Sequence, residues 1–201
     1  MNISANYGTQ NELLLSKLLN FYKTEIDGVY NPDNNLDKMI QIISGESKIS
    51  LRIVDWFVTN YAKKYYVVYE INNSSSKPSN SARRFKVYDD YKLRLKAYSK
   101  KRFDPFCRWE RISIPYKETQ SIETTIGQLN FFNWALNNNV IDYVTEHYQE
   151  IEQDMNNRNS NSRKKEIITI GNKTRKKREE LSISATKSIK KETVKILVNF
   201  D

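Results

Sequence analysis

Apolar residues recur about one helical turn apart in two segments near the start of the chain. In residues 10–26 they form a single stripe, which predicts an amphipathic helix that ends before Gly28. Residues 51–64 repeat the pattern, with Ser50 placed to cap the helix. A short apolar segment at residues 39–43 lies between them. The stripes comprise Leu14, Leu15, Leu18, Leu19 and Tyr22 in the first helix, and Leu51, Val54, Val58 and Tyr61 in the second.

β-Branched and aromatic residues predict extended structure further along the chain. Residues 65–71 (YYVVYEI) favour a strand, and the polar loop NNSSSKPSNSA follows it. Residues 107–116 and 121–126 favour two strands joined by a short turn, which is typical of a β-hairpin. The final VKILVNF, residues 194–200, is a further strand candidate that could rejoin the sheet.

Residues 85–103 begin with a strand pattern and become helical near Asp89. Tyr91, Leu95 and Tyr98 then share one face, so the segment predicts a strongly basic helix. Asp104 and Pro105 follow and stop it.

The next helical segment has a recognisable start. Thr125 and Gln128 have the spacing of a capping box for a helix over residues 127–139. After a break at Asn137–Asn139, an acidic amphipathic helix is expected over residues 140–155.

These elements predict an α+β fold, with helices, a small antiparallel sheet or β-hairpin, and a basic C-terminal extension. We expect an N-terminal helical region at residues 1–48 and an α+β core domain at residues 49–155. Residues 156–201 are expected to form a basic segment with a C-terminal strand, and its first part, residues 156–165 (NNRNSNSRKK), is a linker by composition.

Charge divides the chain into blocks. Residues 83–117 carry twelve basic and four acidic side chains, whereas residues 118–155 carry seven acidic side chains and no Lys or Arg. Residues 156–192 again carry twelve basic and four acidic side chains, and the whole chain has a net charge of +9. Such blocks attract nucleic acid or acidic protein surfaces, or the first two neutralise each other within the fold.

Composition narrows the class of protein. A chain with 38% hydrophobic and 12% aromatic residues can form a packed core. Cys107 is the only cysteine, so no intramolecular disulfide forms, which favours a reducing compartment. No apolar run is long enough to cross a bilayer and the N-terminus lacks signal-peptide features, so we expect neither a membrane span nor secretion.

Catalytic chemistry has little support in the residues. His147 is the only histidine and no glycine-rich phosphate-binding motif occurs, so we predict no catalytic residues, no metal site and no cofactor. One enzymatic alternative stays open, a metal-dependent nuclease. Its carboxylates would be Asp89, Asp90, Asp104 and Glu110, although helix-cap and turn positions also favour these residue types.

Lysine and arginine alternate with aromatic residues in residues 92–112, KLRLKAYSKKRFDPFCRWERI. Single-stranded nucleic acids are held in this way, with cations on the phosphates and rings under the bases. The other interpretation places the rings in the core, with the cations either forming a solvated face or pairing with the acidic helix over residues 142–154. The rings concerned are Tyr98, Phe103, Phe106 and Trp109.

A second basic run, at residues 173–178, is local and largely uncompensated. It could bind nucleic acid, act as a nuclear import signal or capsid anchor, or serve as a solubilising tail. The predicted nucleic-acid-binding residues are Lys92, Arg94, Lys96, Lys100, Lys101, Arg102, Arg108 and Arg111 in the first patch, and Lys173, Arg175, Lys176, Lys177 and Arg178 in the second.

Four long strings carry a family resemblance: LRIVDWFVTNYAKKY, VYDDYKLRLKAYSKKRFDPFCRWERI, IETTIGQLNFFNWALNNNVIDYV and GNKTRKKREELSISATKSIKK with the ending VKILVNFD. They resemble an uncharacterised conserved protein family of giant, nucleocytoplasmic large DNA viruses (mimivirus-like). The resemblance covers most of the chain from about residue 49 onward, whereas the N-terminal 48 residues match nothing in it. It implies no activity, but it implies a viral product located in the host cytoplasm, in a viral factory, or in the virion.

We therefore predict a non-enzymatic viral protein that associates with DNA or RNA during replication, transcription or genome packaging. The alternative is a minor structural or assembly protein of the virion, whose basic faces bind acidic surfaces of viral structural proteins. The oligomeric state stays open.

Overall fold

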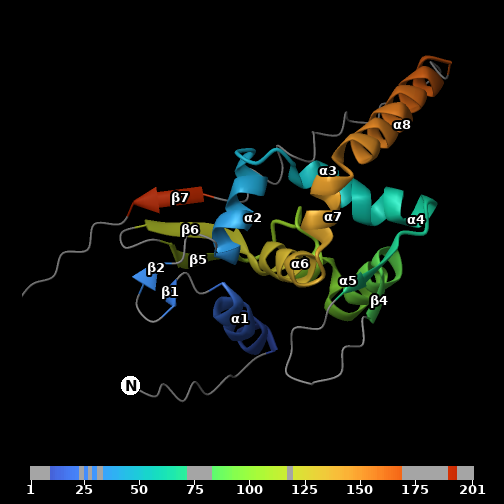
Figure 1. Cartoon of the computed structure of the whole chain (residues 1–201). Helices are drawn as coiled ribbons and strands as arrows, with labels where there is room; N and C mark the ends of the chain where they lie inside the picture. Colours follow the sequence, from blue (N-terminus) through green and yellow to red (C-terminus); the bar gives the residue numbers. More distant parts are fainter. Residues whose placement is uncertain are drawn as a thin grey trace, which may run out of the picture.

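The computed structural model describes residues 10–22, 25–26, 29–30, 34–71, 83–116, 120–168 and 190–193. Figure 1 shows the helices packed around α6, the β5–β6 hairpin extending to one side, and α8 projecting from the body. The predicted α+β fold class is confirmed. In chain order the elements are α1 Gln10–Phe21, β1 Glu25–Ile26, β2 Val29–Tyr30, α2 Asn35–Ser44, α3 Leu51–Trp56, the π-helix η1 Phe57–Tyr61, α4 Ala62–Lys64, β3 Val68–Ile71, β4 Arg83–Lys86, α5 Val87–Phe103, β5 Arg111–Tyr116, β6 Gln120–Thr125, α6 Ile126–Asn137, α7 Val140–Glu146, α8 Tyr148–Ile168 and β7 Lys190–Thr193.

Helix α6 forms the centre of the core. Most of its side chains are buried, including Leu129, Phe131 and Phe132, because its sequence is apolar on nearly every side. The predicted cap is present, since the Thr125 hydroxyl accepts a hydrogen bond from the Gln128 backbone N–H at 3.2 Å. The helix therefore starts where the sequence indicated.

Helices α1 and α2 add their apolar faces to the same core. The buried Tyr22 hydroxyl donates to the carbonyl of Leu129 at 2.7 Å, which ties the end of α1 to α6. The sequence indicated only a short apolar segment where α2 lies, but α2 is a complete helix. The side chain of Asn34 accepts from the Asp37 N–H at its start, and Gly45 ends it with a φ of 82°.

The first predicted helix is shorter than expected. The predicted helix covered residues 10–26, but α1 ends at Phe21. Glu25–Ile26 instead forms strand β1, which pairs with strand β2 at Val29–Tyr30. The intervening Asp-Gly sequence at 27–28 favours a tight turn over continued helix, which explains the difference.

α3, η1 and α4 form one continuous helical rod, as the pattern over residues 51–64 predicted. All four stripe residues of that pattern are buried. Ser50 occupies the N-cap position, although its side chain makes no capping hydrogen bond. The π-helical turn in the middle was not predicted, because a π-helix has no signal in hydrophobic spacing.

The strands form three separate antiparallel groups. β3 pairs with β4, and it starts at Val68 instead of at Tyr65 because Tyr66 adopts a left-handed φ of 52°. The predicted hairpin is confirmed as β5 and β6, with Ile114 opposite Ile122. β7 pairs with the other edge of β6, so the chain returns to this sheet at residues 190–193. The predicted strand at residues 194–200 lies outside the described residues.

The predicted linker over residues 156–165 is wrong, because α8 continues through it to Ile168. Composition favoured a loop there, but the helix is anchored upstream by the buried Ile151 and Met155. Extending an existing helix adds one backbone hydrogen bond per ordered residue, so propagation overrides weak local propensity. The acidic helix predicted over residues 140–155 is divided into α7 and α8 at His147.

α5 and α6 approach closely at one glycine. A Cβ atom on Gly127 would lie 2.8 Å from the carbonyl oxygen of Asp104, at the residue that follows α5. We expect Gly127→Ala to destabilise the fold by about 1–3 kcal/mol, because backbone must move to relieve the clash. Urea unfolding measures the effect. Gln149→Ala, on the exposed side of α8, is the control and should change stability by less than about 0.5 kcal/mol.

Asp55 provides a pH-dependent prediction. Burial, followed by the charge of Asp104, raises the pKa of Asp55 to about 7 from 3.8. The folded state therefore favours the protonated carboxyl, and stability is lost as the pH rises from about 4 to about 7. Asp55→Asn should stabilise the protein by about 1–3 kcal/mol at pH 8 and much less at pH 4.

Thermal unfolding at the two pH values tests the Asp55 prediction, with Asp142→Asn on the exposed side of α7 as the charge-matched control. If Asp55→Asn raised the unfolding temperature equally at both pH values, the charge of the Asp55 carboxylate would not be the cause of the stabilisation.

Candidate functional site

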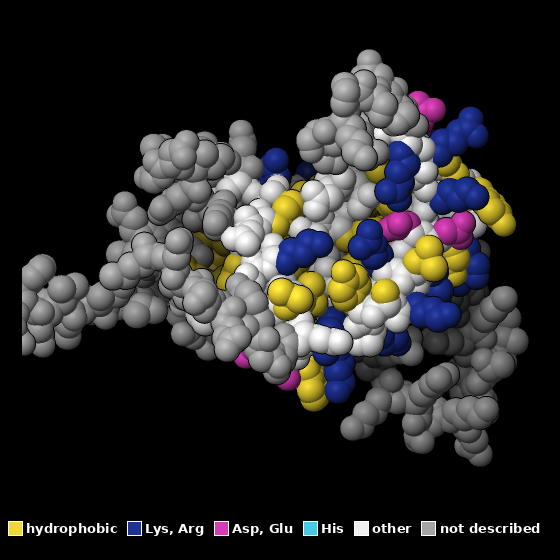
Figure 2. Space-filling view, turned by 90° about the horizontal axis from the view of Figure 1, so that it is seen from below, with side chains coloured by type: hydrophobic (Ala, Val, Ile, Leu, Met, Phe, Trp, Pro, Cys, Tyr) yellow, Lys and Arg dark blue, Asp and Glu magenta, His cyan; other side chains and the backbone are white. Residues whose placement is uncertain are grey.

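The outer side of α5 carries a group of cations that we call the α5 basic face. Four of its members are exposed lysines and the fifth is a half-buried arginine. Figure 2 views the molecule from below and shows Lys and Arg side chains gathered on this side, with few carboxylates among them. The members are Lys92, Lys96, Lys100, Lys101 and Arg102.

The inner side of α5 is held against α6 by aromatic packing. The rings of Tyr91 and Phe103 lie 5.8 and 5.7 Å from the ring of Trp134. The Trp134 indole N–H donates to Asp90 at 2.6 Å, and the Asn130 amide donates to the carbonyl of Arg102 at 2.8 Å. These contacts leave the basic side of α5 facing solvent.

The structure gives local partners to some of the other predicted residues in this patch. Arg94 lies 3.6 Å from Asp90 on its own helix, and Arg111 lies 3.2 Å from Glu123 across the β5–β6 hairpin. Arg108 is exposed in the segment between α5 and β5. The second predicted patch, Lys173, Arg175, Lys176, Lys177 and Arg178, lies outside the described residues.

The four aromatic rings interleaved with these cations take different positions. Phe103 is buried, Tyr98 is half-buried and stacked on Phe103 with centroids 6.1 Å apart, and Phe106 is half-buried. Trp109 is 47% exposed, and the Lys101 ammonium lies 3.5 Å from its ring centroid. The core interpretation therefore holds for three rings, and Trp109 remains available as a stacking surface.

Arg111 and Glu123 join the basic and acidic blocks in the β5–β6 hairpin, but among the described residues the α5 basic face makes no ion pair with the acidic side chains of α7 and α8. The ion pairs of α5 involve Asp90, whereas Asp154 of α8 pairs with Lys64 of α4. The carboxylates Glu150 and Glu152 accept hydrogen bonds from Tyr61 and Tyr148. Pairing of the α5 cations with the acidic helix, one of the two interpretations of the sequence, is therefore wrong for these residues.

A cavity of about 290 Å³ opens beside the α5 basic face. Two of its residues, Ser99 and Glu110, have left-handed φ values of 63° and 38°, which are strained for side chains other than glycine. The buried Oδ1 atom of Asn11 has no hydrogen-bond partner among the described residues. The cavity is lined by Asn11, Ser99, Lys101, Arg102, Trp109 and Glu110, with Ile126 beneath them.

The four carboxylates considered for a nuclease have separate structural contacts. Asp90 accepts from Trp134, Asp104 accepts from the Phe106 N–H at 2.9 Å in a turn, and Glu110 accepts from Asn11 at 3.5 Å. Asp89 is exposed at the start of α5. Within the described residues, no three His, Cys, Asp or Glu side chains gather in a way that could hold a metal ion.

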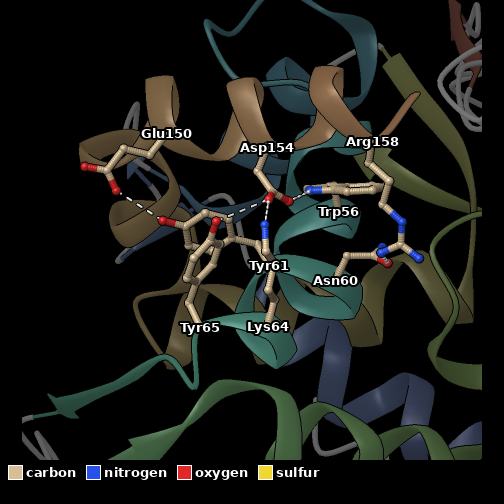
Figure 3. Close-up of polar contacts among 8 residues, drawn as sticks. All are labelled: Trp56, Asn60, Tyr61, Lys64, Tyr65, Glu150, Asp154 and Arg158. Atoms are coloured by element: carbon tan, nitrogen blue, oxygen red, sulfur yellow. Dashed lines mark hydrogen bonds and ion pairs between the residues drawn. The ribbon is translucent and has the colours of Figure 1, made fainter. Parts of the chain in front are cut away.

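A second polar site lies where α8 crosses η1 and α4. Figure 3 shows the side chains of α8 pointing toward those of the helical rod. The groove has a volume of about 590 Å³. It is lined by Asn60, Tyr61, Lys64, Tyr65, Glu150, Gln153, Asp154, Asn157 and Arg158.

Asp154 is the centre of the contacts in this groove. It accepts hydrogen bonds from the Trp56 indole at 3.0 Å, from Lys64 at 2.5 Å and from the Tyr65 hydroxyl at 3.4 Å (Figure 3). Burial alone would raise the pKa of Asp154, but the hydrogen bonds from Lys64 and Trp56 outweigh it and lower the pKa. Burial and the bond to Glu150 raise the pKa of Tyr61 to about 12, so Tyr61 stays a neutral donor.

Further along the groove, Arg158 donates to Asn60 at 2.8 Å and lies over the Trp56 ring at 5.4 Å. Glu150, Asp154 and Arg158 thus each bond to the helical rod, and their main effect is to fix the base of α8 to it.

The chain matches over residues 2–197 a protein family described as a family of unknown function, DUF7197. The chain belongs to this family. The match includes the N-terminal 48 residues, which the resemblance seen in the sequence left uncovered.

The chain is also similar to a protein of a giant virus. "Uncharacterized protein L507" of Acanthamoeba polyphaga mimivirus is 42% identical over 147 residues, which cover 71% of this chain and 52% of that protein. The chain thus spans about half the length of this curated relative. The resemblance to an uncharacterised giant-virus family is therefore supported. No solved structure matches the chain.

Among the described residues, no helix is both long and apolar enough to cross a bilayer.

Sequence reasoning identified the α5 basic face and Trp109, but it missed two features of the site. Asn11 reaches Glu110 across 99 positions of sequence, and Ser99 interrupts α5 within a helical pattern. A serine inside a helix of otherwise good helix formers is a weak signal for such an interruption. Nothing in the sequence around Asn11 indicates its position.

The groove at α8 yields a stability prediction. We expect Asp154→Asn to destabilise the fold by about 1–3 kcal/mol at pH 7, since it weakens a charge-assisted network. The pKa of Asp154 is lowered in the folded state, so its contribution is present above the unfolded value of 3.8 and is lost as the pH falls below it.

Chemical denaturation at pH 7 and pH 3 measures the Asp154 effect, with Glu146→Gln on α7 as the control. If Asp154→Asn lowered the unfolding free energy equally at pH 3, the ionised carboxylate of Asp154 would not be the source of the stability.

Proposed function

We propose that this protein binds single-stranded nucleic acid through the α5 basic face and Trp109. The observation that carries the proposal is the exposed group of cations beside an exposed tryptophan, which makes no ion pair with the acidic side chains of α7 and α8 among the described residues. Within the proposal, the protein acts in viral replication, transcription or genome packaging, in the host cytoplasm or the virion, as a non-enzymatic component. The relative in a giant virus supports this setting.

The arrangement of charge supports backbone contacts. Lys92 and Lys96 are one helical turn apart on a helix whose opposite side is buried, so a phosphate chain can approach both. A rigid helix presents its cations with little loss of backbone entropy on binding. Contacts of this kind add affinity without reading sequence, because they involve phosphate groups only.

Trp109 supports the preference for single strands. Bases that are paired and stacked inside a duplex are not available to a protein side chain, whereas unpaired bases can stack on an aromatic side chain. Trp56 and Trp134 use their indole N–H groups in the fold, and Trp109 is the exposed tryptophan of the described chain.

A structural role in the virion is the second candidate. The α5 basic face and the exposed carboxylates of α7 and α8 lie on different elements and make no ion pair with each other among the described residues. Such separated charges could bridge neighbouring proteins, including acidic surfaces of viral structural proteins. That role requires high copy number in purified particles and little affinity for free nucleic acid.

Binding of the full chain to fluorescent single- and double-stranded DNA and RNA across a salt series tests the first proposal. We expect Lys92→Gln with Lys96→Gln to weaken binding to all single strands and to lower the slope of log K against log salt by about 1–2, because each lost phosphate contact removes roughly 0.7 from the slope.

The matched control is Lys38→Gln with Lys48→Gln, which removes the same charge from exposed positions on and after α2. An equal loss of affinity in this control would mean that net charge, and not the α5 basic face, drives binding. Absence of binding to all four ligands at low salt would overturn the proposal in favour of the structural role.

A further inference from the structure

The cavity beside Trp109 combines features that the phosphate contacts do not use. An exposed ring, two strained backbone positions and an exposed carboxylate meet there, from α5 and the segment before β5. Strained positions persist only where the surrounding structure enforces them, and they occur often at ligand sites.

The polar groups of the cavity form a specific pattern of acceptors and donors. The exposed Glu110 carboxylate supplies two acceptor oxygens, and among the described residues one of them has a long 3.5 Å contact to the Asn11 amide. Lys101 and Arg102 supply donors on the same lining. A ligand that fits must therefore present two donors next to an acceptor.

We infer that this cavity binds an unpaired guanine base, an inference that rests on the proposed function. The Watson–Crick edge of guanine carries the N1–H and N2–H₂ donors beside the O6 acceptor. Adenine and cytosine each offer a single exocyclic amine, and uracil or thymine offers one N–H between two acceptors. Guanine alone among the common bases presents two donors to the two oxygens of the Glu110 carboxylate while offering O6 to a cation.

The ring of Trp109 completes the site. The Lys101 ammonium covers it in the absence of ligand at 3.5 Å, but the Lys101 side chain is exposed and can rotate away. The base then takes the place of the ammonium on the ring, and the ammonium pairs with the adjoining phosphate. Guanine recognition and backbone binding thus share Lys101.

Oligothymidylate of about twelve nucleotides with one central guanine, adenine, cytosine or hypoxanthine tests the inference with the full chain, by fluorescence anisotropy at fixed salt. We expect the guanine strand to bind about tenfold more tightly than the adenine and cytosine strands. Hypoxanthine lacks the N2 amine, so the hypoxanthine strand should bind with nearly the same affinity as the adenine and cytosine strands.

Glu110→Gln separates recognition from charge. It should abolish the preference for guanine while leaving or slightly raising affinity for plain oligothymidylate, because it removes a negative charge beside the α5 basic face. Glu146→Gln makes the same change of charge on the exposed side of α7 and should keep the guanine preference. A general loss of folding would lower binding to every strand and is distinguishable from this pattern.

Free guanosine 5′-monophosphate provides an independent readout through tryptophan fluorescence. We expect it to quench emission in the parent chain and not in Trp109→Phe, with adenosine 5′-monophosphate much weaker. If oligonucleotides bind with no preference among the central bases, the guanine inference is overturned and the proposed function stands. If no oligonucleotide binds, quenching by the guanine nucleotide alone supports a nucleotide pocket, and no quenching overturns the inference.

Discussion

The packing of α5 on α6 is the contact on which the candidate site depends. α6 is apolar on nearly every side, so it is stable only when other elements cover it completely, and α5 supplies one of those covers through Tyr91 and Phe103. Asn130 and Gly127 then set the distance between the two helices, one by bonding the Arg102 carbonyl and the other by having no side chain. Because the inner face of α5 is buried against α6, the cations of α5 must face water.

The α5 cations and the acidic side chains of α8 are kept apart by the same architecture. Two acidic residues of α8 have partners on the helical rod of α3, η1 and α4, because Asp154 joins Trp56 and Lys64 and Glu150 accepts from Tyr61. Among the described residues the α5 basic face therefore makes no ion pair with α7 or α8, although Arg111 and Glu123 join the two charge blocks in the β5–β6 hairpin. A basic face without local neutralisation produces a strong positive potential, which is the physical basis for proposing a phosphate-rich ligand.

The cavity at Trp109 arises where three segments distant in sequence meet. α1 contributes Asn11, the interrupted end of α5 contributes Ser99 and its cations, and the segment before β5 contributes Trp109 and Glu110. Among the described residues the Glu110 carboxylate has one long 3.5 Å contact there, whereas in the groove at α8 Asp154, Tyr61 and Arg158 have partners at hydrogen-bond distance. That contrast distinguishes a surface suited to a ligand from one that stabilises the fold.

The sequence by itself determined the α+β class, most helix positions, the β5–β6 hairpin, the cap at Thr125 and the basic character of α5, because hydrophobic periodicity, capping and charge are local properties. It could not determine the helical continuation of α8 past Asn156, since helix propagation from a buried base overrides composition there. The π-turn, the left-handed Ser99 and the contact of Asn11 with Glu110 were decided only by tertiary structure. Each depends on packing between residues far apart in sequence, and that packing also separated the buried rings from the exposed Trp109.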